Sequence, residues 1–265
     1  MEVLKIWDGE IPFYDKNINN AENDNLNKIE FYRCRGESDA TVVIFPGGAY
    51  YLRSSDHEGR QIAQYYNKNG INAAVVEYRV SPYTYPVPLL DAQRAIKVLR
   101  RNADKLGIKN NKIITCGFSA GGHLCSMMAT KPDICNIYGD ETDKMSARPD
   151  GAILCYPVIS TDEKIANTDS VRHLLGDKYT ELKGEFSSDE NVTESTCPCF
   201  IWHTADDGCV NVQNSLRFAQ ALIRNKVKCE LHIYPTGPHG VGPAAQYPHL
   251  QSWLGLSVKW IKECF

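Results

Sequence analysis

The sequence predicts an α/β fold in which a mostly parallel β-sheet is covered by helices on both faces. Short apolar, β-branched runs alternate with longer segments of helical character, which is the pattern of repeated strand–helix–strand units. Glycines close several of these segments, as at Gly70 and Gly107. A chain of 265 residues is long enough for one large domain with a substantial core.

The expected elements follow a polar, Asn-rich lead-in over residues 1–27, for which we expect irregular structure. Apolar and β-branched runs predict strands over residues 28–34 (at a sheet edge), 41–45, 71–78, 112–116, 152–156, 199–203 and 229–234. Helices are expected over residues 57–69, 89–106, 124–129, 213–225 and 251–263. Their period is clearest in 89–106, where apolar residues recur at roughly every third or fourth position, as at Ala92, Ala95, Ile96 and Leu99.

Residues 160–196 interrupt this alternation. Asp, Glu, Thr and Asn occur throughout this stretch, and only residues 171–175 form a short apolar patch. A long insertion in a compact domain is more often a functional lid or cap than a plain connection. We therefore expect a single domain over residues 1–265 with a cap insertion at about 160–196.

Composition and charge argue against certain binding partners and cellular compartments. A net charge of −3 gives no electrostatic case for nucleic acid or an anionic membrane. No run approaches the roughly 20 apolar residues of a membrane span, and residues 1–8 lack the layout of a signal peptide. The ten cysteines are therefore expected as reduced thiols in a cytoplasmic protein. Cys197 and Cys199 are the only close pair, so neither a metal nor another cofactor is expected.

Residues 112–123 carry the clearest chemical signal. A strand breaks at Gly117, presents Ser119 two residues before Gly121, and continues into a helix, which matches the G-x-S-x-G spacing of a nucleophile elbow. The two glycines let strand and helix approach a serine in a strained conformation. The hydroxyl then projects from the carboxyl edge of the sheet, beside a helix N-terminus that favours a developing oxyanion. A plain strand-to-helix turn is the alternative, and the strand and helix on either side favour the catalytic interpretation.

A serine nucleophile needs a base to remove its proton and an acid to orient that base. In an elbow enzyme these partners follow in the order serine, acid, histidine, on loops after later strands. The sequence offers Asp206 or Asp207 after strand 199–203, and His239 after strand 229–234. Three residues of the right type in the right order are much more specific than any one of them.

An oxyanion hole requires two backbone donors. The N–H of Ala120, at the start of the helix after the serine, is one expected donor. The second is expected from Gly48 or Ala49, because small residues after the strand 41–45 let backbone amides face the pocket.

Other titratable residues have structural interpretations. His123, one helical turn beyond the serine, is expected to be packed and hydrogen-bonded, and His203 to be structural. Asp91 and Arg94 are expected to form an i,i+3 ion pair on their helix. The remaining histidines have no chemical neighbourhood in the sequence: His57, His173, His232 and His249.

Four motifs together resemble the α/β-hydrolase superfamily: residues 46–50 (PGGAY), 117–123 (GFSAGGH), 202–207 (WHTADD) and 237–240 (GPHG). Within it, the chain most resembles small bacterial esterases of the acetyl-xylan esterase-like or sugar-ester hydrolase kind, related to hormone-sensitive lipase. The resemblance runs from about Val42 to the carboxyl end. Two positions depart from the usual pattern: Pro46 stands where a histidine is common, and Asn211 where a proline is common.

The resemblance also distinguishes the two aspartates. In that superfamily the acid stands three residues before a valine that opens the next turn, which is the relation of Asp207 to Val210. Gly208 lets the chain turn sharply after the acid. We therefore expect Asp207 as the acid, and Asp206 as a cap of the loop or of the following helix.

The function implied is that of a serine carboxylesterase that hydrolyses short-chain, in particular acetyl, esters of a sugar or another small polar alcohol. Ser119 would attack the carbonyl and form an acyl-enzyme, His239 would transfer protons, and Asp207 would orient His239, without a cofactor. The expected partner is a small ester such as an acetylated sugar, with neither nucleic acid nor membrane. A homo-oligomer is compatible with the sequence.

Two other functions fit parts of the pattern. An oligopeptidase-like serine hydrolase shares the triad, but the chain has no propeller or other large gating domain. A non-catalytic α/β-hydrolase scaffold that binds a ligand would not need all three triad residue types, which the sequence retains.

Overall fold

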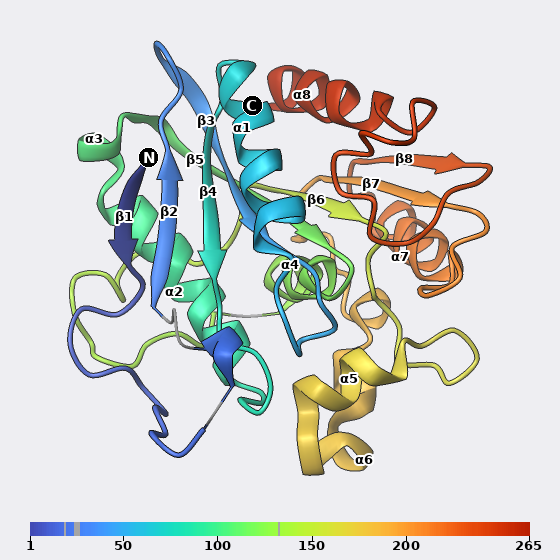
Figure 1. Cartoon of the computed structure of the whole chain (residues 1–265), viewed down its shortest axis with the longest axis horizontal. Helices are drawn as coiled ribbons and strands as arrows, with labels where there is room; N and C mark the ends of the chain where they lie inside the picture. Colours follow the sequence, from blue (N-terminus) through green and yellow to red (C-terminus); the bar gives the residue numbers. More distant parts are fainter. Residues whose placement is uncertain (19, 24–26, 132) are drawn as a thin grey trace.

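An eight-stranded sheet forms the centre of the computed structural model, which describes residues 1–18, 20–23, 27–131 and 133–265 (Figure 1). Its order is β1-β2-β4-β3-β5-β6-β7-β8. The strands are β1 (Glu2–Lys5), β2 (Lys28–Tyr32), β3 (Ser38–Phe45), β4 (Asn72–Glu77), β5 (Ile108–Phe118), β6 (Gly151–Cys155), β7 (Cys199–Thr204) and β8 (Cys229–Tyr234). β2 pairs antiparallel with β1 and β4, and every other neighbouring pair is parallel. The carboxyl ends of β3 to β8 therefore lie along one edge.

The start of the chain differs from the expectation of an irregular lead-in. β1 pairs with β2 and takes the edge position that we expected for β2. β1 has only four residues, and its side chains are alternately half-buried and exposed. Such a short amphipathic strand gives almost no periodic signal, and it forms because β2 offers a free edge. Residues 19 and 24–26 of the lead-in lie outside the described residues.

Helices cover both faces of the sheet (Figure 1). α1 (Gln61–Lys68) and α8 (Ser252–Cys264) pack into one core, and α2 (Val87–Arg101), α4 (Ala120–Thr130) and α7 (Gln213–Arg224) into the other. β3 feeds both cores, because successive side chains point to opposite faces: Val42 and Ile44 join the first core, Val43 and Phe45 the second. The short α3 (Ala103–Leu106) ends at Gly107 with φ 68°, a left-handed cap that glycine adopts readily.

The insertion, residues 160–196, lies beyond the carboxyl ends of the strands (Figure 1). It holds α5 (Thr168–Leu175), α6 (Tyr179–Leu182) and 3-10 turns at Gly176–Lys178, Lys183–Phe186 and Ser188–Glu190. The side chain of Asn167 caps α5 by accepting the N–H of Ser170. The expected apolar patch forms the buried side of α5, where Val171, Leu174 and Leu175 join the core of α2, α4 and α7.

The expected ion pair between Asp91 and Arg94 is wrong. Asp91 binds Arg79 instead, with 2.6 and 2.8 Å between their charged atoms. Arg94 binds Asp140 and Asp143, each at 2.6 Å. Both residues of α2 are buried, and a buried charge needs several well-placed partners, which distant loops provide better than a neighbour one helical turn away.

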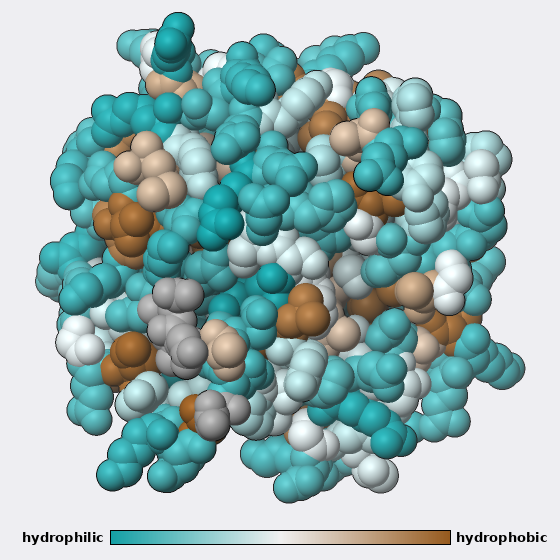
Figure 2. Space-filling view, viewed as in Figure 1, coloured by the Kyte–Doolittle hydropathy of each residue, from teal (hydrophilic) through white to brown (hydrophobic). Residues whose placement is uncertain are grey.

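The surface seen in Figure 2 is mostly hydrophilic, and apolar residues are scattered over it in small groups. Isolated apolar residues are normal on a globular domain. None of the helices in the described ranges has the length and hydropathy that a membrane crossing requires.

Candidate active site

Ser119 lies on a sharp turn between β5 and α4. Its backbone has φ 53° and ψ −116°, a strained conformation for a residue with a side chain. Glycines permit the close approach: a Cβ on Gly117 would lie 2.1 Å from the carbonyl oxygen of Gly121, and one on Gly121 would lie 2.0 Å from that of Phe45. The steric reason for the G-x-S-x-G spacing is thus confirmed.

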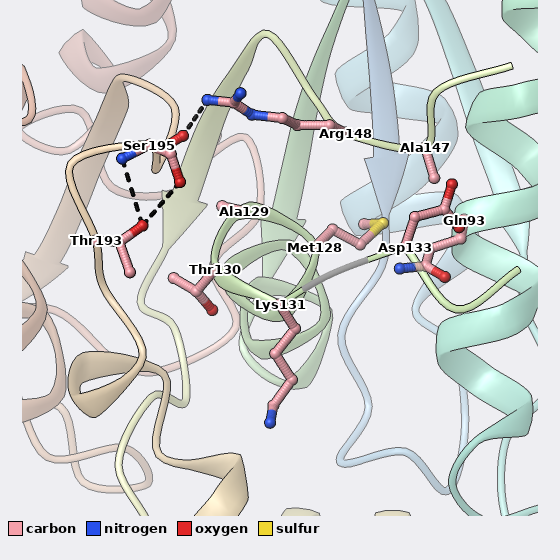
Figure 3. Close-up of a pocket in the computed structure, with 10 residues that line it drawn as sticks. All are labelled: Gln93, Met128, Ala129, Thr130, Lys131, Asp133, Ala147, Arg148, Thr193 and Ser195. Carbon is pink, nitrogen blue, oxygen red and sulfur yellow. Dashed lines mark hydrogen bonds between the residues drawn. The ribbon is translucent and has the colours of Figure 1, made fainter.

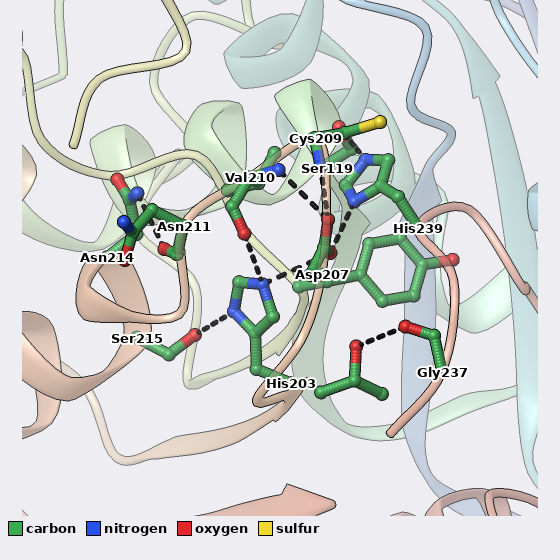
Figure 4. Close-up of polar contacts among 12 residues, drawn as sticks. Ser119, His203, Asp207, Cys209, Val210, Asn211, Asn214, Ser215, Gly237 and His239 are labelled. Carbon is green, nitrogen blue, oxygen red and sulfur yellow. Dashed lines mark hydrogen bonds and ion pairs between the residues drawn. The ribbon is translucent and has the colours of Figure 1, made fainter. Parts of the chain in front are cut away.

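The structure brings Ser119, His239 and Asp207 into one hydrogen-bonded chain (Figure 4). Nε2 of His239 lies 2.8 Å from Oγ of Ser119, and Nδ1 lies 2.7 Å from Oδ2 of Asp207. A carboxylate can only accept, so Nδ1 carries the proton and Nε2 is free to accept the serine hydroxyl. The side chain of Asp207 is 1% exposed and that of His239 17%, so the chain of bonds runs from the interior to the pocket.

Backbone and side-chain donors hold Asp207 in its ionised form. Its Oδ1 accepts the N–H groups of Cys209 and Val210 at 2.8 and 2.9 Å. Burial would raise the pKa of Asp207, but hydrogen bonds from His203, His239 and the N–H of Val210 outweigh burial and hold that pKa well below its ordinary value. An ionised carboxylate is the form that orients and stabilises a histidine base.

Asp206 does not contact His239. Its carboxylate accepts the hydroxyl of Thr236 at 2.6 Å and the N–H of Gly237 at 2.8 Å. Hydrogen bonds from Thr236 and Gly237 lower the pKa of Asp206. We expected Asp206 to cap its own loop or the next helix; it ties down the histidine loop, residues 235–251, instead.

His203 is fully buried beneath Asp207 (Figure 4). Its Nδ1 lies 2.8 Å from the hydroxyl of Ser215, and its Nε2 lies 3.0 Å from the carbonyl oxygen of Val210 and 3.3 Å from Oδ2 of Asp207. A carbonyl accepts only, so Nε2 carries the proton and shares it with the carboxylate. The burial and hydrogen bonds of His203 agree with a structural role, which stays a prediction. Its contact with the acid could not be foreseen from the sequence.

The loop of residues 46–52, here called the glycine loop, lies against the elbow. A Cβ on Gly47 would lie 3.0 Å from Cβ of Ser119, so the loop backbone touches the serine. The N–H of Gly47 donates to Glu58 at 2.8 Å and is engaged there. Gly48 and Ala49, with φ 132° and 54°, line the same pocket as Ser119. Ala120 is the first residue of α4, where helix N–H groups lack intrahelical acceptors.

The pocket above Ser119 has a volume of about 430 Å³. The glycine loop forms one side and the start of α5 another. It is lined by Gly48, Ala49, Tyr51, Leu52, Ser54, Glu58, Ser119, Asn167, Asp169, Ser170, His173, Cys209, His239 and Gly240. The rings of Tyr51 and His173 lie 5.2 Å apart at 31° to each other. Nδ1 of His173 lies 2.9 Å from the carbonyl oxygen of Ala49, which joins α5 to the glycine loop.

A second cavity, of about 340 Å³, opens at the far end of α4 (Figure 3). Its lining residues are Gln93, Met128, Ala129, Thr130, Lys131, Asp133, Ala147, Arg148, Thr193 and Ser195. These lining residues include no histidine, and the hydroxyl of Ser195 is hydrogen-bonded to Thr193 at 2.8 Å. The lining residues of this cavity therefore offer no serine–histidine pair.

Two residues beside the triad, Glu58 and Tyr156, could not be predicted as part of the site from the sequence. Both are buried near Ser119 and His239 and bind each other. Each lies in a segment whose pattern predicts only a helix or a strand end. Among the described residues, no group of three or more His, Cys, Asp or Glu side chains could hold a metal ion.

Comparison with known proteins identifies the family. The BD-FAE family model matches residues 30–222. The chain belongs to the BD-FAE family. It is similar to endo-1,4-beta-xylanase B of Butyrivibrio fibrisolvens, with 38% identity over 81% of this chain and 34% of that protein. It is also similar to the acetylxylan esterase of Xylanibacter ruminicola, with 31% identity over 92% of this chain and 49% of that protein.

A solved structure is similar along nearly the whole chain. It is that of an acetyl ester-xyloside bifunctional hydrolase from Caldicellulosiruptor lactoaceticus, with a TM-score of 0.89, 38% identity, and coverage of 99% of this chain and 96% of that one. The expected α/β-hydrolase fold and the resemblance to acetyl-xylan esterase-like proteins are thus confirmed. The chain spans 34% and 49% of the length of these two curated relatives.

Proposed function

We propose that this protein is a serine carboxylesterase that hydrolyses short-chain acyl esters, above all acetyl esters, of a sugar or another small polar alcohol. The observation that carries the proposal is the hydrogen-bonded chain from Ser119 through His239 to Asp207 at the floor of a pocket. Membership of the BD-FAE family supports it, as does similarity to an acetylxylan esterase and to an acetyl ester-xyloside hydrolase.

In the first half of the reaction, Oγ of Ser119 attacks the ester carbonyl carbon while Nε2 of His239 takes the hydroxyl proton. Asp207 keeps the proton on Nδ1 and stabilises the imidazolium that forms. The N–H of Ala120 and that of Gly48 or Ala49 stabilise the oxyanion. The bond to the alcohol then breaks, and His239 gives its proton to the departing alkoxide.

In the second half, water replaces the alcohol. His239 takes a proton from that water as its oxygen attacks the acyl carbon, and the same donors stabilise the second oxyanion. Collapse of this intermediate breaks the bond to Oγ, which regains the proton from His239. The carboxylic acid leaves, and the enzyme returns to its starting state without a cofactor.

The volume of the pocket supports the proposal that the acyl group of the ester is short. Its volume of about 430 Å³ is near the lower end of the range for ligand sites and must hold both halves of the ester. Leu52, Ala49 and Tyr51 supply much of its apolar lining. A long acyl chain together with the alcohol half would extend beyond this volume.

Residues of the insertion support the proposal that the alcohol half of the ester is polar. We propose that residues 160–196 act as a cap whose helix α5 recognises the alcohol half of the ester. Asp169 and His173 of α5 bring polar groups to the pocket, and Tyr51, which is 55% exposed, lies beside His173. A sugar ring presents hydroxyl groups to polar side chains and C–H groups to an aromatic face, and this surface offers both.

The experiment is a substrate profile. Rates are measured for p-nitrophenyl esters from acetate to octanoate, and acetate release is measured from acetylated xylo-oligosaccharides. We expect kcat/KM to be highest for acetyl or propionyl esters, and the acetylated sugars to be deacetylated. A profile that peaks at eight carbons or more would contradict the short-chain proposal. Failure to release acetate from any acetylated sugar would contradict the proposal that the alcohol half of the ester is a sugar.

A further inference from the structure

A buried carboxyl group lies in the pocket without belonging to the triad. Glu58, on the π-helix η2 (Ser55–Arg60), is only 3% exposed and lines the pocket with Ser119. Its two oxygens have different partners. Oε2 accepts the N–H of Gly47 at 2.8 Å, and Oε1 accepts the hydroxyl of Tyr156 at 2.7 Å.

Tyr156 extends this connection to the histidine loop. Its hydroxyl oxygen accepts the N–H of Gly242 at 2.9 Å. Its ring packs edge-on against the imidazole of His239, with 4.9 Å between ring centroids and 65° between planes. Through Tyr156, the carboxyl group of Glu58 therefore connects the glycine loop to the segment that carries the base.

Such an arrangement is costly for the fold. Burial raises the pKa of Glu58, although hydrogen bonds from Tyr156 and Gly47 and the nearby imidazole of His239 act in the opposite direction. Replacing a buried charge by apolar groups is often neutral or stabilising. One oxygen of this buried carboxyl group binds the glycine loop, and the other binds the tyrosine that holds the histidine loop. Such a group next to a nucleophile is better explained by the reaction than by stability.

We propose that Glu58 is a positioning residue for the ester hydrolysis proposed above, on which this inference rests. By holding the N–H of Gly47, it fixes the backbone of the glycine loop, so that the next amides, of Gly48 and Ala49, face the oxyanion. By holding Tyr156, it fixes the aromatic surface against which His239 rests. The oxyanion donors and the base are thereby kept in register with each other.

Two substitutions distinguish the effect of the length of the Glu58 side chain from the effect of its charge. Glu58→Gln keeps the length, but its amide must donate to Tyr156, whose own hydroxyl then loses its acceptor. Glu58→Asp keeps the carboxyl group but is one methylene too short to bind both Gly47 and Tyr156. We expect each to lower kcat for p-nitrophenyl acetate by about 10- to 100-fold with little change in KM, because small misplacements of catalytic groups cost about that much. Tyr156→Phe, which only removes the hydroxyl, is expected to lower kcat less.

The pH profile distinguishes positioning from a merely structural role. The titratable groups around this carboxyl are His57, Tyr78, Cys155, Tyr156 and His239. The charge interaction with His239 acts on the pKa of Glu58 against burial, and Glu58→Gln removes it. The acid limb of kcat/KM is therefore expected to move to lower pH in Glu58→Gln and to stay in place in Glu58→Asp. A structural role would lower Tm without moving this limb.

Asp150→Asn is the matched control. Asp150 also accepts a backbone N–H, from Ile113 at 2.9 Å, and a side-chain donor, from Arg100 at 2.8 Å. It directly precedes β6, at the amino end of that strand, whereas Ser119 follows the carboxyl end of β5. We expect this variant to lose stability while kcat stays at the wild-type value.

A fluorophosphonate probe, which labels activated serines, gives a second measure that does not depend on the choice of ester. We expect Glu58→Gln and Tyr156→Phe to be labelled more slowly than wild type. Wild-type kcat and labelling rate in both variants, with the acid limb of Glu58→Gln at its wild-type position, would overturn the role of Glu58 and leave the proposed function standing. A wild-type protein that neither hydrolyses esters nor is labelled would overturn the proposed function itself.

Discussion

The nucleophile elbow and the insertion border the same pocket but are built in different ways. At the elbow, the position of Ser119 is determined by only a few neighbouring residues, through the spacing of the glycines and the strained backbone. In the insertion, α5 packs on the core by its apolar side and leaves polar side chains such as Asp169 facing the pocket. The elbow thus depends on local steric rules, which tolerate little change. The insertion depends on side chains that can vary without disturbing the fold.

The two regions are nevertheless joined by buried hydrogen bonds. His123 of α4 binds the hydroxyl of Tyr50 at 2.9 Å and the carbonyl oxygen of Phe186, in the insertion, at 2.8 Å. One turn further along α4, the hydroxyl of Ser126 donates to that of Ser188 at 2.7 Å. The position of the insertion over the serine is therefore set by α4, the same helix that sets the elbow.

The largest effect is expected at the elbow itself. Ser119→Ala should remove ester hydrolysis, since loss of a triad serine costs on the order of 10⁴–10⁶ in rate. The fold should be retained, because alanine only removes the hydroxyl. Measured kcat for p-nitrophenyl acetate tests this, with circular dichroism and Tm as the control for folding. Near-normal turnover by a folded Ser119→Ala protein would refute the mechanism.

The next effect distinguishes two adjacent aspartates. Asp207→Asn should lower kcat by about 10⁴, because an amide favours the wrong tautomer of His239. Asp206→Asn should lower kcat by less than about tenfold, because asparagine can still accept from Gly237 and donate to Thr236. The kcat values of the two variants, measured side by side, test the assignment. The reverse order would move the acid by one residue.

The same contrast explains how much the sequence could predict. The elbow and the order of Ser119, acid and histidine follow from local spacing, and the structure brings those side chains together. The roles of Ser119, Asp207 and His239 stay predictions until they are tested. The two ends of the Glu58–Tyr156 hydrogen bond lie 98 positions apart, so no local pattern contains it.

The ion-pair partners of buried charged residues could not be predicted from the sequence either. Asp91 and Arg94 are close in sequence, but their partners Arg79 and Asp143 come from other segments. A helical period predicts which residues share a face, and it carries no information about which loop reaches that face. The short strand β1 was missed for a related reason, since it forms only because β2 offers it an edge.

A smaller effect is expected at the exposed side of the pocket. Tyr51→Ala should raise KM for acetylated xylo-oligosaccharides by about tenfold, the worth of one aromatic contact, and leave p-nitrophenyl acetate nearly unaffected. Tyr14 is the matched control, because it is 58% exposed against 55% for Tyr51 and lines a different groove. Equal effects of Tyr51→Ala on both substrates, or an effect of Tyr14→Ala on the sugar ester, would contradict recognition of the sugar by Tyr51.

The smallest effect concerns the link between the two regions. Burial lowers the pKa of His123 to about 4, and the positive charge of Lys131 acts in the same direction, although the hydrogen bond from Nε2 to the carbonyl oxygen of Phe186 opposes both. Nδ1 accepts the hydroxyl of Tyr50. Between pH values of about 4 and about 6.5, the ordinary pKa of histidine, His123 is protonated in the unfolded chain but neutral in the folded protein. Stability is therefore full above that window and is lost as pH falls through it.

The free energy of unfolding, measured in urea at pH 7 and pH 4.5 for wild type and for His123→Gln, tests this link. Glutamine does not titrate, so the wild type should lose more stability between the two pH values, by an amount on the order of 2–3 kcal/mol. Asp207, whose pKa is lowered, contributes stability that is lost only below the ordinary aspartate pKa of about 3.9, so it does not fall in the same window. An equal pH dependence of the two proteins would mean that His123 takes up its proton in the folded state, with its bond to Tyr50 broken. The insertion would then be held over Ser119 by its apolar contacts and by Ser126, and no longer by the imidazole.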